Sequence, residues 1–163
     1  MKRWLGLLAG VWALMVSAQT PVSPDAIPVA ENFKAVTAEG RVVELATMPK
    51  DKLTLVVFYD PDCKDCRQML FALRHSSVIS QRVGESLLQV LTVDVDANEV
   101  LWRESRGELP DSWTNTLLRS DLSGSRLYDT SAVPMLYLLD ADQRIILADN
   151  DVQALISLLI SLW

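Results

Sequence analysis

LTLVVFYDPDCKDC, residues 53–66, is the stretch that decides how the rest of this 163-residue chain is interpreted. Its first seven residues are apolar or β-branched without interruption, which is typical of a central strand buried on both faces. Asp60–Asp62 contains a proline and breaks that strand. Apolar residues then recur at spacings of three and four, which predicts a helix from Cys63 to about Arg74 with one buried face. The residues on that face are Cys66, Met69, Leu70 and Leu73.

The two cysteines of this stretch are the only two in the sequence, and they form a C-x-x-C motif where a strand gives way to a helix. Backbone N–H groups at a helix start lack partners, and the helix dipole is positive there, so an anion is stabilised. We therefore predict that Cys63 is the attacking thiolate. Cys66 lies one turn deeper, and we predict that it resolves a mixed disulfide by attacking Cys63.

Other roles for the cysteine pair remain open at this point. A static disulfide would close a very short loop, and such a loop contributes little stability. A zinc site has only His75 as a histidine ligand, nine residues beyond Cys66, so we predict no metal. A peroxidatic cysteine is a further enzymatic alternative, but two cysteines this close together fit disulfide exchange better. Thiol–disulfide exchange is the interpretation we prefer.

The composition describes an acidic globular protein of one domain. Half of the residues are apolar, which excludes disordered and low-complexity classes. The net charge is −6 and the pI is about 4.7, so we expect no nucleic-acid partner. No glycine-rich phosphate loop is present, and we predict no cofactor.

The N-terminus has the pattern of a secretory signal. Met1–Arg3 is basic, residues 4–16 carry no charge, and Val16-Ser17-Ala18 supplies small residues for cleavage. We expect residues 1–18 to be a signal peptide and the mature protein to be periplasmic, with an uncleaved anchor as the alternative. Three prolines within residues 19–30 predict an extended leader, so the folded domain is placed at residues 31–163.

The remaining elements predict an α/β fold with a mixed sheet. A hairpin turning at Gly40 comes first, and strands follow the central one at residues 87–95, 135–139 and 144–148, the last two forming a hairpin. A short helix is expected at residues 98–106, and residues 109–129 are expected to be irregular. The final helix is expected to begin at a capping Asn150, with a buried stripe that ends at Trp163. A βαβ unit followed by a ββα unit gives a mixed sheet flanked by helices.

A second motif completes a resemblance to a known family. Phe58–Cys66, together with Val133-Pro134 before an apolar strand, resembles the exported TlpA-like thioredoxin superfamily, over roughly Phe33 to the C-terminus. The resemblance implies a thioredoxin-like three-layer sandwich with an N-terminal β-hairpin. It also implies a thiol–disulfide oxidoreductase that reduces or isomerises disulfides in protein substrates. Because the sequence has no nucleotide-binding motif, we expect a membrane electron donor to keep the protein reduced.

From this family, Cys63 carries over as the nucleophile, Cys66 as the resolving thiol and Pro134 as the cis-proline. A cis peptide there would leave the Val133 backbone free to pair with an extended substrate. Val57 stands where thioredoxins keep a buried acid, so proton transfer to Cys66 would rely on water or on another carboxylate.

Charged residues around the cysteines indicate the direction of electron flow. Lys64 favours the thiolate, whereas Asp60, Asp62 and Asp65 oppose it, which predicts a reducing couple and a reductase or isomerase role. Asp62 could alternatively serve only as a helix cap. The non-enzymatic alternative is a binding module with a static disulfide. The sequence predicts neither the substrate nor the oligomeric state.

Overall fold

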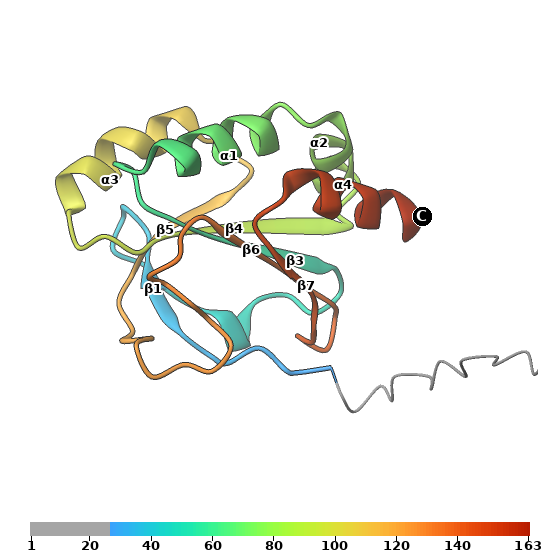
Figure 1. Ribbon diagram of the computed structural model, residues 1–163, viewed down its shortest axis with the longest axis horizontal. Coiled ribbons are helices and arrows are strands. Elements are labelled where there is room, and N and C mark those ends of the chain that lie inside the picture. The colour runs from blue at the N-terminus through green and yellow to red at the C-terminus, as the bar shows by residue number, and fades with distance from the viewer. Residues whose placement is uncertain (1–26) are drawn as a thin grey trace, which may run out of the picture.

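The computed structural model describes residues 27–163, which form one seven-stranded mixed sheet with four α-helices (Figure 1). The strand order is β2-β1-β5-β4-β3-β6-β7. The signal peptide expected at residues 1–18 and most of the leader expected at 19–30 lie outside the described residues. The predicted fold class, an α/β protein with a mixed central sheet and an N-terminal hairpin, is confirmed.

The elements have the following bounds in chain order. The strands are β1 Lys34–Val36, β2 Val42–Glu44, β3 Leu53–Tyr59, β4 Leu88–Asp94, β5 Thr114–Leu118, β6 Met135–Leu139 and β7 Ile145–Asp149. The α-helices are α1 Lys64–Arg74, α2 Ser77–Gly84, α3 Glu99–Ser105 and α4 Val152–Ser161. Two short 3-10 helices are η2 Leu45–Thr47 and η3 Arg106–Glu108.

Strand β3 is the centre of the sheet, as its uninterrupted apolar sequence predicts. It pairs in parallel with β4 and antiparallel with β6, and every residue from Thr54 to Tyr59 is buried. The β1–β2 hairpin turns at Gly40, whose φ of +80° is a conformation that glycine adopts without strain. The C-x-x-C motif therefore lies just beyond the C-terminal end of the central strand.

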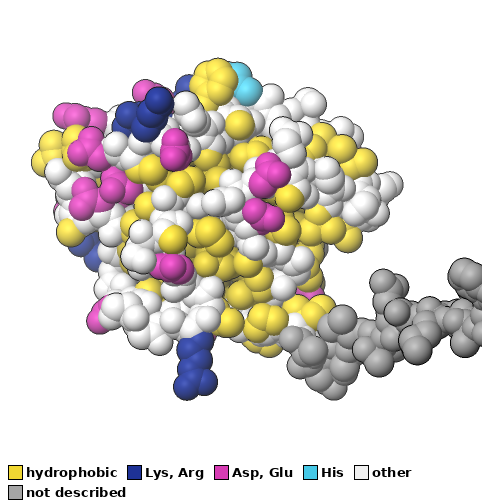
Figure 2. All heavy atoms as spheres, in the orientation of Figure 1, with side chains coloured by type: hydrophobic (Ala, Val, Ile, Leu, Met, Phe, Trp, Pro, Cys, Tyr) yellow, Lys and Arg dark blue, Asp and Glu magenta, His cyan; other side chains and the backbone are white. Residues whose placement is uncertain are grey.

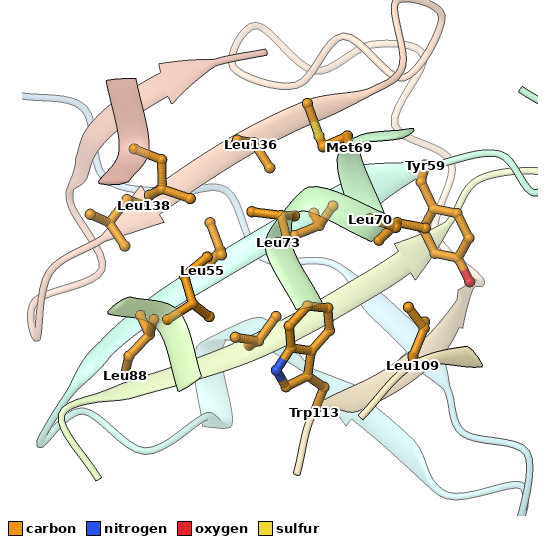
Figure 3. Close-up of a cluster of buried hydrophobic side chains, with 14 of the residues drawn as sticks. Leu55, Tyr59, Met69, Leu70, Leu73, Leu88, Leu109, Trp113, Leu136 and Leu138 are labelled. Atoms are coloured by element: carbon orange, nitrogen blue, oxygen red, sulfur yellow. The ribbon is translucent and has the colours of Figure 1, made fainter. Parts of the chain in front are cut away.

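The two faces of the sheet are covered differently. One face packs against α1, α2 and α4 through a cluster that includes Leu55, Leu73 and Leu138 (Figure 3). The four helices lie on this side of the sheet (Figure 1). The opposite face packs against η2 and the segment 119–134, which contribute Leu45, Leu122 and Tyr128. The layer on this second face is therefore built mainly from loops.

Residues 109–129, expected to be irregular, contain strand β5. Three of its five residues are polar, so the strand does not stand out as an apolar run. The Thr92 hydroxyl donates to Asn115 Oδ1 at 2.7 Å, and the Thr116 hydroxyl donates to the Thr92 carbonyl at 2.8 Å. Polar side chains thus satisfy one another between β4 and β5, which stabilises the strand without an apolar sequence.

Helix α4 differs from its prediction at both ends. Asp151, not Asn150, is the N-cap, and its carboxylate accepts a hydrogen bond from the Gln153 N–H at 2.8 Å. Trp163 is half exposed and does not continue the buried stripe. Its ring instead lies under the guanidinium of Arg82, which is 4.6 Å from the ring centroid. Leu155 and Leu159 are fully buried and, together with the partly buried Val152 and Leu158, pack the helix against the core.

The described N-terminal residues run along the outer edge of β7. The Ile145 N–H donates to the Pro28 carbonyl at 2.9 Å, and the Ala30 N–H donates to the Gln143 carbonyl at 2.8 Å. Val29 and Arg144 form an antiparallel bridge between these two bonds. Within residues 27–163, no helix is both long enough and apolar enough to cross a bilayer.

Candidate functional site

The connection between β3 and α1 is a tight turn organised by Asp60. Its Oδ1 accepts a hydrogen bond from the Asp62 N–H at 2.7 Å, and its carbonyl accepts one from the Cys63 N–H at 3.1 Å. The Arg67 guanidinium donates to the Pro61 carbonyl at 2.9 Å and so ties the turn to the first turn of α1. These bonds hold the C-x-x-C motif at the end of the buried strand.

Cys63 is the N-cap of α1. Its backbone is extended, with φ −75° and ψ 121°, and its Sγ accepts a hydrogen bond from the Cys66 N–H at 3.1 Å. The alternative interpretation of Asp62 as the cap is therefore wrong, because the residue three positions before the Cys66 amide is Cys63. The sulfur occupies the position where an unpaired helix amide and the helix dipole favour a negative charge.

The two cysteines differ strongly in their environment. Cys63 is half-buried, whereas Cys66 is fully buried under the sheet-facing side of α1. The pair is separated by 2.6 Å and is not joined in a disulfide. Burial raises the pKa of the Cys66 thiol to about 12, an effect that the neighbouring Cys63 reinforces and the Asp60 backbone N–H partly offsets. One sulfur faces outward and its partner is held protonated beneath it.

Val133 and Pro134 lie beside the cysteines. The peptide bond between them is cis, and Met135, the next residue, pairs with Phe58 near the end of β3. Val133 and Cys63 pack against the same core cluster. Pro134 also lines a groove of about 400 Å³ between α1 and the start of α4. The structure thus places the predicted substrate-binding segment next to helix α1, at the same end of the central strand as the cysteine motif.

The charged residues predicted to modulate the cysteines are all on the surface. Asp62, Lys64 and Asp65 have exposed side chains, and Asp65 borders the groove beside Pro134. Acidic side chains are spread across the face shown in Figure 2, whereas the basic ones lie at its upper and lower margins. No three His, Cys, Asp or Glu side chains within residues 27–163 are grouped in a way that could hold a metal ion.

Two polar groups near the site, Tyr59 and Asp94, are not predicted as functional residues from the sequence. They face each other in the register of β3 and β4, and both are buried. The Tyr59 hydroxyl and Asp94 Oδ2 have no hydrogen-bond partner. Burial is the main cause that raises the pKa of Asp94 to about 7; the hydrogen bond from the Asp96 N–H opposes the rise, and the Asp96 and Asp60 carboxylates add to it. The available signal was a single carboxylate within the mostly apolar run of residues 87–95.

No family model and no curated protein sequence matches this chain. Several solved structures are similar to it. A thioredoxin-like protein from Bacteroides caccae is 30% identical with a TM-score of 0.75, over 82% of this chain and 48% of that one. This chain therefore spans about half the length of that protein. A conserved protein of unknown function from Bacteroides fragilis is 31% identical with a TM-score of 0.72, over 80% of this chain and 96% of that one.

More distant structures share the fold. The thioredoxin domain of a thiol-disulfide oxidoreductase from Bacteroides vulgatus is 21% identical with a TM-score of 0.69, over 83% of this chain and 95% of that one. At this identity the likeness concerns the arrangement of strands and helices alone.

Proposed function

Because this chain belongs to the thioredoxin-like proteins, we propose that Cys63 and Cys66 form a redox-active dithiol that reduces or isomerises disulfide bonds in proteins. The observation that carries the proposal is the capping geometry of Cys63. Its sulfur is partly accessible, accepts a helix amide and lies against a second, buried sulfur. A static structural cysteine needs none of these three features.

The reaction follows from the arrangement of the two sulfurs. The Cys63 thiolate attacks one sulfur of a substrate disulfide, so that a mixed disulfide forms and the other substrate sulfur leaves as a thiolate. Cys66 then loses its proton and bonds to Cys63, and the second substrate thiolate is released. The substrate gains two electrons and the Cys63–Cys66 pair loses them. Reduction thus needs an external reductant to regenerate the dithiol, whereas isomerisation does not.

The Val133–Pro134 segment would hold the substrate during this exchange. Both residues are partly exposed, and the segment immediately precedes β6 beside the C-x-x-C turn. An extended substrate segment could add main-chain hydrogen bonds to the Val133 backbone, as a peptide adds to a strand edge. Its disulfide would then lie against Cys63. The groove beside Pro134 gives the neighbouring substrate side chains a place to lie.

The location and the electron source are also proposals. The secretory pattern of residues 1–18 supports export to the periplasm, where protein disulfides persist. The reductase direction would require an electron donor in the membrane, because we expect no cofactor site in this chain. The surplus of Asp62 and Asp65 over Lys64 beside the cysteines supports the reducing direction.

A disulfide-exchange assay tests the proposal. Reduced wild-type protein should accelerate the reduction of insulin disulfides by dithiothreitol, and Cys63→Ser should abolish this activity while retaining the fold. Cys66→Ala should accumulate a mixed disulfide with its substrate, which mass spectrometry of the trapped complex would identify. A wild-type protein without exchange activity, and with a Cys63–Cys66 bond that resists dithiothreitol, would instead indicate a binding module with a static disulfide.

A further inference from the structure

The buried carboxyl group of Asp94 has a hydrogen-bond partner for only one of its two oxygens. The residue ends strand β4 and has no solvent-exposed surface. Its Oδ1 accepts a hydrogen bond from the Asp96 N–H at 2.8 Å, while its Oδ2 is buried without a partner. Burying an ionised carboxylate that has an unpartnered oxygen costs free energy, so this environment favours the protonated form of Asp94.

The side chain lies on the sheet face that carries the cysteines. Side chains alternate along β4, and Leu88 and Val90 belong to the cluster beneath α1, as does Cys66. Asp94 follows at even spacing from these two residues and therefore points to the same face. It lies directly opposite Tyr59, whose buried hydroxyl is raised in pKa by burial and by the charges of Asp94 and Cys66.

Within residues 27–163 no Lys or Arg forms an ion pair with Asp94. Arg67 and Arg74 of α1 do line the pocket that includes its register partner Tyr59. The charged groups that act on it are the carboxylates of Asp60, at the end of β3, and Asp96, just beyond β4. On the other side of β4, its register partner in β5 is the apolar Leu117. Asp60 also acts on Cys66, which its carboxylate charge disfavours as a thiolate. Asp94 is thus the buried member of a group of three carboxylates, whose other two members, Asp60 and Asp96, are half-buried.

We propose that Asp94 is a positioning residue that makes the Cys63–Cys66 dithiol a stronger reductant as the pH rises through neutrality. The inference rests on the proposed exchange function and assigns it a direction. Asp94 and the cysteines have neighbours in common: the charges of Asp94 and Cys66 both act on the Tyr59 hydroxyl, and the Asp60 carboxylate acts on both Asp94 and Cys66. When ionised, it opposes the negative charge that the reduced pair carries and so favours the uncharged disulfide.

Burial is what makes this residue more effective than the aspartates on the surface. Asp62 and Asp65 are closer to the cysteines in sequence, but water and salt screen their exposed carboxylates. A charge in the protein interior is screened much less and acts over a longer distance. Below the pH at which Asp94 titrates, the carboxyl is neutral and the opposition disappears.

The redox equilibrium with glutathione, measured at pH 5 and at pH 9, tests the inference. Asp94→Asn keeps the shape of the side chain and removes its charge. At pH 9 we expect this variant to shift the equilibrium about five- to tenfold toward the dithiol, which is a potential up to about 30 mV more positive. At pH 5, where Asp94 is neutral in the wild type, the two proteins should agree within about twofold.

Asp96→Asn is the matched control. It makes the same chemical change two residues away on a half-buried side chain and retains the backbone N–H that binds Asp94. We expect its equilibrium to stay within about twofold of the wild type at both pH values. An Asp94→Asn shift of equal size at pH 5 and pH 9, or no shift at all, would overturn the inference while leaving the exchange function intact.

A measurement on the wild-type protein covers the case in which the variant does not fold. Linkage is reciprocal: if the Asp94 charge opposes the reduced pair, reduction must raise the pKa of Asp94. Carbon-13 NMR of the Asp94 carboxyl should show a titration midpoint about 0.7 to 1 unit higher in the reduced protein than in the oxidised one, which is the five- to tenfold effect expressed as a pKa difference. Equal midpoints in the two states would refute the inference. A wild-type pair that does not exchange with glutathione at all would refute both the inference and the proposed function.

Discussion

The sulfur of Cys63 caps the helix that carries Cys66, through a 3.1 Å hydrogen bond from the Cys66 amide. The same atom thus contributes to the start of α1 and occupies the position of the proposed nucleophile. Stability and activity can be separated at this residue because serine, like cysteine, can accept the amide hydrogen bond.

The two roles of Cys63 predict different outcomes for two variants. Cys63→Ser should lose exchange activity and keep its stability, since the hydroxyl replaces the cap. Cys63→Ala should lose the same activity and also about 1 kcal/mol of the free energy of unfolding, because the helix amide loses its acceptor. Urea denaturation of both variants, compared with reduced wild type, checks this. Equal stability of the serine and alanine variants would contradict the capping role.

The difference in burial between the two cysteines predicts selective alkylation. Iodoacetamide at pH 8 should modify Cys63 in the reduced protein and leave Cys66 unmodified, because Cys66 is buried and the pKa of its thiol is raised to about 12. Peptide mapping by mass spectrometry locates the label. In Cys63→Ser, labelling should fall to the slow rate of a buried thiol. Rapid modification of Cys66 in either protein would show that it is more accessible than the structure indicates.

The raised pKa of Asp94 predicts that the stability of the folded protein depends on pH. This pKa is raised to about 7 in the folded protein from an ordinary value of 3.8, so the folded state holds a proton that the unfolded state releases. Its stabilising protonation is therefore complete below about pH 4 and is lost as the pH rises to 7. Relative to reduced wild type, Asp94→Asn should gain about 2 to 4 kcal/mol of unfolding free energy between pH 4 and pH 8. Urea titrations across this range measure the difference, and a constant difference would exclude a raised pKa for Asp94.

The cap of α4 gives a test outside the cysteine site. Asp151→Ala should lower the free energy of unfolding by about 1 kcal/mol, because the Gln153 amide loses its acceptor, whereas Asp151→Asn should retain most of the stability. Asn150→Ala, one residue earlier, should change the stability little. Thermal denaturation of the three variants is sufficient to compare them. A larger loss for Asn150→Ala than for Asp151→Ala would move the start of the helix back to the residue expected from the sequence.

The sequence predicts the central part of the fold well because burial there leaves a strong local pattern. Strand β3 is apolar throughout, and α1 has its buried residues at helical spacing, so each element can be identified without its neighbours. The C-x-x-C motif could be placed for the same reason. The cysteines sit at the junction of two elements that are both identifiable on their own, and the structure brings Pro134 to that junction.

The parts that sequence analysis missed depend on contacts between distant segments. Strand β5 is stabilised through Thr92–Asn115 and Thr92–Thr116 hydrogen bonds across the sheet, which no local pattern reveals. Helix α2 was not expected, although Ser76 caps it by accepting the Ile79 amide at 3.4 Å; only Ile79 is buried along its length. The environment of Asp94 likewise arises from the register of β3 and β4. The sequence alone does not show whether a single carboxylate at the end of a strand will be buried or exposed to solvent.

The short run of chain at residues 28–30 has a consequence for how separate molecules meet. It occupies hydrogen-bonding groups at the start of the outer edge of β7, and an open strand edge is a template for joining sheets from different molecules. Shortening the chain to begin after residue 30 would expose those groups at a β-strand end rich in isoleucine and leucine. We therefore expect a chain that lacks this segment to self-associate more readily than the chain that has it.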